Sequence, residues 1–186
     1  SFYNMTKDGQ WIVAGAAWGG SEETNLHLVE VATGLTEPLT DVKDVQIADP
    51  LWSDDGTKLY YRSNETNGKD FHVFELDVVT RAKRVVLVQE GYNAPNVISK
   101  DGKWLVTVQF PSNVDADLYL VNLQSGTADH LTPHEGNAIY GAYSFAPDNS
   151  FIYVTTNANK EGVTRRATID LATKTLSFLD EGTKWD

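Results

Sequence analysis

The residues best suited to chemistry are a histidine and a glutamate in adjacent positions, His134-Glu135. In zinc proteases these residue types begin the pattern His-Glu-x-x-His, in which two histidines one helical turn apart bind the metal and the glutamate acts as base. Here position 138 is Ala138, and the segment is predicted to be a loop rather than a helix. His130 and His134 are therefore interpreted as solvated or capping residues, and we expect neither a metal nor another cofactor.

Two serines can be compared with a peptidase nucleophile, Ser21 in Gly19-Gly20-Ser21-Glu22-Glu23 and Ser144 in Gly141-Ala142-Tyr143-Ser144-Phe145. A nucleophilic serine of an α/β-hydrolase lies at the centre of Gly-x-Ser-x-Gly, on a sharp turn between a strand and a helix. Neither serine has that pattern, and the sequence lacks the alternation of strands and helices that would form a hydrolase core. We predict that the chain has no catalytic residue of its own.

The composition is that of a folded protein, and it disfavours several classes of binding partner. Among 186 residues, 26 Asp and Glu outnumber 15 Lys and Arg, and the formal charge of −11 disfavours nucleic acid and anionic membranes. No apolar run approaches the roughly 18 residues of a membrane helix. The absence of cysteine excludes disulfides and thiolate metal sites. Because the sequence starts at Ser1 in the middle of a pattern, we expect a processed product or a fragment; its location stays open, with a periplasmic or secreted one favoured.

A turn between two apolar runs recurs along the whole chain at intervals of 46 or 47 residues. Asp-Gly between strand-like segments is a strong hairpin signal, because the turn needs a residue that tolerates positive φ. Asn is the next residue after Gly to accept that conformation. We interpret the residues of these turns as structural. They are Asp8-Gly9, Asp55-Gly56, Asp101-Gly102 and Asp148-Asn149.

Each repeat is predicted to contain four antiparallel strands. The first strand precedes the turn and the second follows it; a polar loop, such as the one at 112–115, then leads to a third strand and a short fourth. The predicted first strands are Ser1–Met5, Asp49–Trp52, Ala94–Ile98 and Ile139–Phe145, and the predicted fourth strands are Thr36–Thr40, Lys83–Leu87, Ala128–Thr132 and Thr175–Leu179. The predicted units are residues 1–45, 46–92, 93–138 and 139–186.

Several of these strands are apolar on both faces, as in Leu118-Tyr119-Leu120-Val121, and such a strand must be covered on both sides. Stacking small sheets around an axis covers both faces, which makes an all-β fold, a β-propeller of four-stranded blades, the predicted architecture. A β-sandwich does not explain four copies of one unit. About four blades are present, as a partial propeller or, alternatively, as a complete four-bladed ring.

One aromatic residue stands outside the repeat. Trp11 and Trp104 occupy the same repeat position, which predicts packing between blades. Trp18 lies instead in the Gly-rich segment 18–24, next to Glu22-Glu23, and is the better candidate for contact with a partner.

The aligned repeats resemble those of TolB-type propellers. The segment Pro50–Tyr60 is similar to the core Pro-x-Trp-Ser-Pro-Asp-Gly-Lys, with Asp54 in place of the second Pro. Ser99–Leu105, Asp117–Leu123 and the Leu-Thr pairs at 39–40 and 131–132 match the repeat as well. Such repeats occur in TolB, in tricorn-like proteases and in the N-terminal propellers of prolyl oligopeptidase and dipeptidyl-peptidase-type serine peptidases, and the long loops of this chain look most like the last group.

The resemblance implies a non-catalytic propeller that gates or positions peptide substrates beside a hydrolase domain of the parent chain. It also implies a role for Glu22 and Glu23, because dipeptidyl-peptidase-type propellers hold the substrate's terminal ammonium with a Glu-Glu pair; solvated loop carboxylates are the alternative. A TolB-like scaffold that binds a protein partner is the alternative function. An open set of four blades would leave apolar sheet faces uncovered, so we expect the isolated chain to self-associate.

Overall fold

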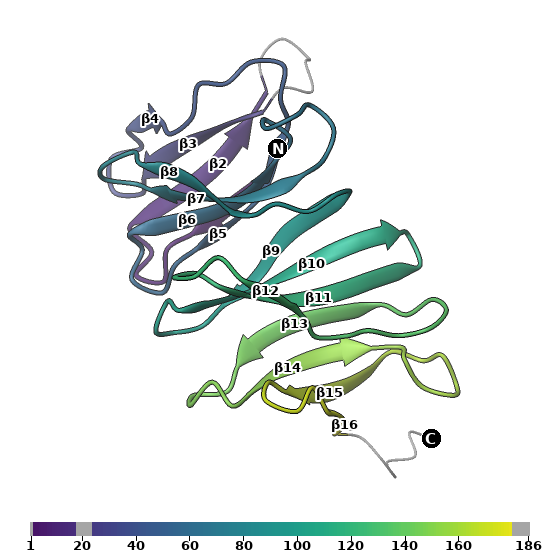
Figure 1. The fold of residues 1–186 in the computed structure, drawn as a ribbon. Helices are drawn as coiled ribbons and strands as arrows, with labels where there is room; N and C mark the ends of the chain where they lie inside the picture. Colours follow the sequence, from purple (N-terminus) through teal and green to yellow (C-terminus); the bar gives the residue numbers. More distant parts are fainter. Residues whose placement is uncertain (1, 18–23, 180–186) are drawn as a thin grey trace. The chain divides into compact units, whose positions relative to one another are not determined.

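The computed structural model describes residues 2–17 and 24–179, and within them the regular secondary structure is all strand (Figure 1). Sixteen strands in this part of the chain form four antiparallel sheets of four strands, which confirms the predicted all-β fold of four-stranded blades. In every sheet the strands follow one another in sequence order, as in a meander. The described residues contain no helix with the length and hydropathy needed to cross a membrane.

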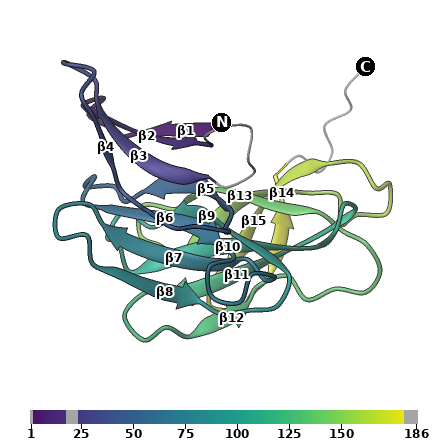
Figure 2. The same ribbon diagram turned by 90° about the horizontal axis from the view of Figure 1, so that it is seen from above.

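The chain divides into two compact units, Ser1–Pro95 and Asn96–Asp186, with the division inside β9. The first unit holds the first two sheets, and strands β6 to β8 can be followed side by side in Figure 2. The first sheet consists of β1 (Phe2–Met5), β2 (Trp11–Ala16), β3 (Asn25–Glu30) and β4 (Thr36–Pro38). The second consists of β5 (Ile47–Trp52), β6 (Lys58–Ser63), β7 (His72–Asp77) and β8 (Lys83–Leu87).

The third and fourth sheets follow along the chain. The third consists of β9 (Tyr92–Ile98), β10 (Trp104–Ser112), β11 (Asp115–Asn122) and β12 (Ala128–His130). The fourth consists of β13 (Tyr140–Phe145), β14 (Phe151–Thr156), β15 (Arg165–Asp170) and β16 (Leu176–Phe178).

The core of the first unit lies between its two sheets. Val13 of β2 pairs with Leu28 of β3, and both side chains are buried against the second sheet. There Tyr61 pairs with Phe74, and their rings stack with centroids 5.5 Å apart. Burying side chains of this size contributes about 1.5–3 kcal/mol each to folding, so this two-sheet core is a major source of the unit's stability.

The second unit repeats this arrangement. In the third sheet Val106 pairs with Leu120, and in the fourth Ile152 pairs with Ile169; all four side chains are buried. Alternate positions on the central strands of the fourth sheet are half-buried or, as at Tyr153, exposed. Burial thus alternates with a period of two, which distinguishes the better covered face of this sheet from the other.

The sequence-based boundaries are wrong in three respects. β5 and β9 each begin two residues earlier than predicted, at Ile47 and Tyr92. A polar loop was expected at 112–115, but β10 and β11 extend toward each other until Ser112 pairs with Asp115, past a bulge, and only Asn113 and Val114 remain between them. Three of the four fourth strands are also shorter than predicted. Hydrogen bonding to the third strand nevertheless continues one residue past each end, because the N–H groups of Leu39, Leu131 and Leu179 donate to carbonyls of that strand.

Candidate functional site

The three candidate contact residues, Trp18, Glu22 and Glu23, lie outside the described residues, and their proposed role stays a prediction. Another loop that does not repeat, Asn64–Gly68, is described. Asn64 is buried, accepts the N–H of Gln46 (2.8 Å) and donates to the carbonyl of Gly68 (3.3 Å). Because its polar groups hold the loop together, Asn64 has a structural role there.

The aspartates of the Asp-Gly turns are engaged by their own turns. In three turns a hydroxyl two residues earlier donates to Asp Oδ1 at 2.7 Å, and the same hydroxyl accepts the N–H of the first residues of the next strand. The donors are Thr6, Ser53 and Ser99, paired with Asp8, Asp55 and Asp101. Hydrogen bonds hold the pKa of each carboxyl below its ordinary value. The bond from the hydroxyl has the largest effect on this pKa, and the bond from the backbone N–H two residues after the aspartate adds to it. These carboxylates act as turn formers, and the hydroxyls are partners that sequence reasoning missed.

The fourth turn lacks that hydroxyl and provides a natural comparison. Ala146 stands where the other turns have Thr or Ser, and Asp148 is held by Ser150 instead, through both its hydroxyl (2.7 Å) and its N–H (3.1 Å). The residue after Asp148, Asn149, has φ 59°, as the left-handed turn position requires.

This difference predicts opposite effects for two substitutions. Ser53→Ala removes one donor from Asp55 and one acceptor from Lys58 N–H, and should lower the free energy of unfolding by about 1 kcal/mol. Ala146→Ser supplies the missing hydroxyl and should raise the urea midpoint. Urea unfolding followed by tryptophan fluorescence measures both effects. A lowered midpoint for Ala146→Ser would contradict the stabilising role that we assign to the hydroxyl at this turn position.

A second repeated contact joins neighbouring sheets within each unit. Arg81 and Lys174 occupy left-handed turn positions (φ 61° and 58°), where the first and third sheets have glycine. Arg81 Nη2 lies 2.7 Å from Glu37 of β4, and Lys174 Nζ lies 2.5 Å from Asp129 of β12. In both units a cation on a turn of one sheet thus reaches an acid on the last strand of the preceding sheet. The sequence contains a signal for this contact, because Arg81 and Lys174 stand at the turn position where the other two repeats have Gly34 and Gly126.

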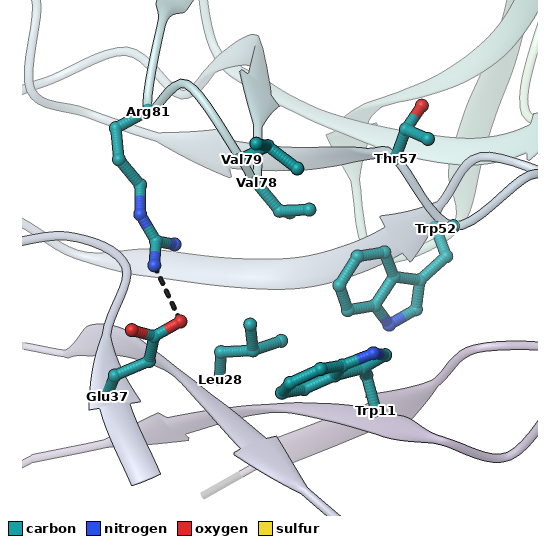
Figure 3. Close-up of a pocket in the computed structure, with 9 residues that line it drawn as sticks. Trp11, Leu28, Glu37, Trp52, Thr57, Val78, Val79 and Arg81 are labelled. Carbon is teal, nitrogen blue, oxygen red and sulfur yellow. Dashed lines mark hydrogen bonds and ion pairs between the residues drawn. The ribbon is translucent and has the colours of Figure 1, made fainter.

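One end of the first unit's core opens into a cleft of about 360 Å³. Trp11 and Trp52 lie on one side of it, Leu28 lies beside them, and the Arg81–Glu37 ion pair closes the other side (Figure 3). Trp52 Nε1 donates to the carbonyl of Asn4 at 3.3 Å. Trp11 was predicted to pack between blades, and it does pack against this core. Since the charged lining residues neutralise each other, the cleft has the chemistry to bind an apolar side chain.

A cluster of titratable groups in the second unit is the other candidate. His134 has 13% of its side chain exposed and lies 3.0 Å from Asp115 through Nε2. Its Nδ1 lies 2.8 Å from the Thr132 carbonyl, and His130 Nε2 lies 2.8 Å from Asp117. His134 is therefore a largely buried partner of carboxylates. Of the two interpretations, solvated or capping, the solvated one is wrong for His134, whereas its contact with the Thr132 carbonyl is compatible with a capping role. Sequence reasoning missed Asp115 and Asp117 because they lie on a strand, far along the chain from the histidine.

Asp115, Asp117 and His134 also have ligand atoms within 4.8 Å of one another, the spacing a metal ion requires. Each of these groups already has a hydrogen-bonding partner: Asp117 Oδ1 accepts from Thr132 Oγ1 (3.0 Å) and faces His130, and both ring nitrogens of His134 face oxygen acceptors. A doubly protonated imidazole donates on both sides of its ring, so a bound proton accounts for the contacts of His134 without a metal ion.

Comparison with known proteins decides the family. Residues 1–172 match the family described as prolyl oligopeptidase, N-terminal β-propeller domain. The chain belongs to this family. The assignment agrees with the predicted TolB-like and prolyl-oligopeptidase-type repeats, and it makes the four sheets blades of a propeller. No curated protein matches the chain in sequence.

Solved structures of similar fold include both groups named by the repeat pattern. A prolyl endopeptidase superposes with a TM-score of 0.76 at 18% identity, over 96% of this chain and 28% of that one. TolB from Acinetobacter baumannii gives 0.70 at 19% identity, over 95% and 42%. A puromycin-hydrolyzing peptidase of Mycobacterium tuberculosis gives 0.69 at 12%, over 96% and 28%. At these identities the likeness shows the fold alone, and this propeller chain spans less than half the length of each.

Proposed function

We propose that this chain is a non-catalytic part of the propeller of a serine peptidase of the prolyl oligopeptidase family, and that it controls which peptides reach the hydrolase domain. The match of residues 1–172 to the N-terminal propeller of that family carries the proposal. The missing Gly-x-Ser-x-Gly supports it, since the nucleophile must then come from another part of the parent protein. The hydrolase domain and the peptide substrates are its proposed partners.

The proposed gating rests on how each unit is held together. Buried faces join the two sheets of the first unit, and the Arg81–Glu37 pair fastens their outer edge. We propose that the joined sheets form part of a wall that keeps folded proteins from the hydrolase domain, which separates access from the bond-breaking step.

The proposal predicts different activities for the chain and its parent. The chain alone should not react with a fluorophosphonate serine probe, whereas the full-length parent should be labelled and should cleave a short fluorogenic peptide much faster than the same sequence inside a folded protein. Removing the fastening pair with Glu37→Gln and Arg81→Gln should raise cleavage of the larger substrate relative to the smaller one.

Lys69→Gln serves as a control, because Lys69 is 81% exposed and its nearest carboxylate oxygen is 3.9 Å away. Labelling of the isolated chain, or equal cleavage of both substrates by the parent, would contradict the proposal.

A TolB-like interaction scaffold is the second candidate, supported by the likeness to TolB. It requires a parent without a reactive serine, so the probe experiment separates the two functions. In either case we propose that the isolated chain self-associates through uncovered sheet faces, where Tyr3 is 78% and Tyr143 62% exposed. Light scattering after gel filtration tests this, and a stable monomer would remove it.

A further inference from the structure

His134 lies in the connection between the third and fourth sheets, and both of its ring nitrogens face acceptors. Nδ1 is 2.8 Å from the carbonyl oxygen of Thr132 and 3.4 Å from Asp117 Oδ1. Nε2 is 3.0 Å from Asp115 Oδ1. A carbonyl or a carboxylate offers no proton, and a neutral imidazole carries only one N–H. Only the imidazolium can therefore donate on both sides of the ring.

We propose that His134 is a proton-operated fastener, which as an imidazolium ties the β12–β13 connection to β11 and releases it when the proton leaves. The contacts around it show what would be released. Asp115 also accepts the N–H of Ala138 (3.4 Å), and Ala116 N–H donates to the Ala138 carbonyl (2.9 Å). The fastener therefore acts where the connection is joined to β11, just before the fourth sheet begins.

The groups that face His134 come from four elements. β11 supplies the two carboxylates Asp115 and Asp117; the connection supplies the Thr132 carbonyl and, at the next position, the exposed Glu135. β13 supplies the ring of Tyr140, with centroids 5.5 Å apart. β12 supplies His130, which contacts Asp117 (2.8 Å) and stacks on Tyr119. The surroundings are thus dominated by negative charge.

The direction of titration follows from these contacts. The Thr132 carbonyl first, and then Asp115 and Asp117, raise the pKa of His134 above its ordinary value, although partial burial opposes them. A raised folded-state pKa means that the stabilisation is fully present below the unfolded value of about 6.5 and is lost as pH rises through the folded value.

The first sheet contains a similar junction, and its described residues Thr40, Asn25 and Val42 include no titratable group. Thr40 Oγ1 accepts Leu26 N–H and donates to Asn25 Oδ1, both at 2.9 Å. Thr132 Oγ1 accepts Leu118 N–H at 2.9 Å and donates to Asp117 Oδ1 at 3.0 Å in the same way. Where the first sheet completes the junction with Asn25 and the N–H of Val42 (3.0 Å), the third has Asp117 and His134. Asp117→Asn with His134→Val gives the third sheet the residues that the first sheet has at these two positions.

The test is the pH dependence of the full chain between pH 5 and 9. In the wild type, NMR titration of the imidazoles should place the His134 pKa above the ordinary value. The urea midpoint should fall as pH rises through it, and exchange of the Ala116 amide should accelerate on the order of tenfold. The double variant should lose this pH dependence, whereas His27→Gln, in the other unit, should keep it.

Several results would overturn the proposal: a His134 pKa at or below the ordinary value, a wild-type urea midpoint that does not change with pH, or a pH dependence that persists in the double variant. Stabilisation by added Zn²⁺ that disappears with His134→Val would also overturn it, since the cluster would then be a metal site. If the double variant does not fold, the wild-type titration and amide exchange still decide.

Discussion

Asn93→Asp should lower the free energy of unfolding at neutral pH by about 3 kcal/mol or more, because it places an oxygen where three carbonyl oxygens converge. Asn93 is fully buried, and its Nδ2 donates toward the carbonyls of Phe71 (3.0 Å), Gln89 (3.0 Å) and Glu90 (3.3 Å). These contacts fasten the segment between β8 and β9 to the residue just before β7. A carboxylate there would be buried among acceptors with no donor to offer.

The carboxyl introduced by Asn93→Asp also gives this prediction a pH signature. Burial among carbonyls should raise its pKa, so the variant should regain stability as pH falls and the carboxyl becomes a donor again. Urea unfolding at several pH values measures this. Asn113→Asp, in the exposed β10–β11 hairpin loop, should have little effect. A loss below 1 kcal/mol at neutral pH would show that the segment is held by other contacts.

Glu75→Gln should lower the free energy of unfolding by about 2 kcal/mol, the second largest effect we expect. Glu75 is 6% exposed and accepts from Arg84 Nε (3.0 Å) and Nη2 (2.8 Å), Lys58 Nζ (3.0 Å) and Tyr60 Oη (3.0 Å). The side chains of Lys58 and Arg84 are 41% and 44% exposed, so water can solvate them again after the change. That exposure keeps the estimate below the cost of breaking a fully buried pair.

The protonation of Glu75 gives a second measurement. Burial raises its pKa, but the hydrogen bonds from Arg84, Lys58 and Tyr60 outweigh burial and leave the pKa lowered. Its stabilisation is therefore present above the ordinary value of about 4.3 and is lost as pH falls through the folded value. A double-mutant cycle with Arg84→Gln measures the coupling. Equal acid sensitivity in the wild type and Glu75→Gln would argue against this network.

The repeat, the strand types and the family were predictable from the sequence because their signals are local. Asp55-Gly56 predicts a turn through the backbone preference of two adjacent residues, and the aromatic and β-branched residues of β14 predict a strand. The β10–β11 hairpin was mispredicted because Ser112 and Asp115 look like loop residues until the register of the long ladder pairs them. A polar segment forms a loop only where its backbone does not hydrogen-bond to a neighbouring strand.

The candidate sites were predicted much less well, since their residues meet only across the fold. His134 was recognised in the sequence as a histidine beside a glutamate, but its partner Asp115 lies 19 positions away on β11. Glu37 and Arg81 are 44 positions apart; the repeat comparison singles out Arg81, which stands where other repeats have glycine, but does not identify Glu37 as its partner. For Trp18, Glu22 and Glu23 the sequence remains the basis of the prediction.

By itself, the sequence determined that this protein is built from four four-stranded units, separated by turns, of a known propeller family, because turn chemistry and strand propensity depend on a few neighbouring residues. The tertiary structure decided which polar residues have structural partners and where the residue with the proposed pH response, His134, lies. It placed the Asp-Gly carboxylates in their own turns and buried Asn93 among three carbonyls. It also enclosed His134 between acceptors that only strand register brings together.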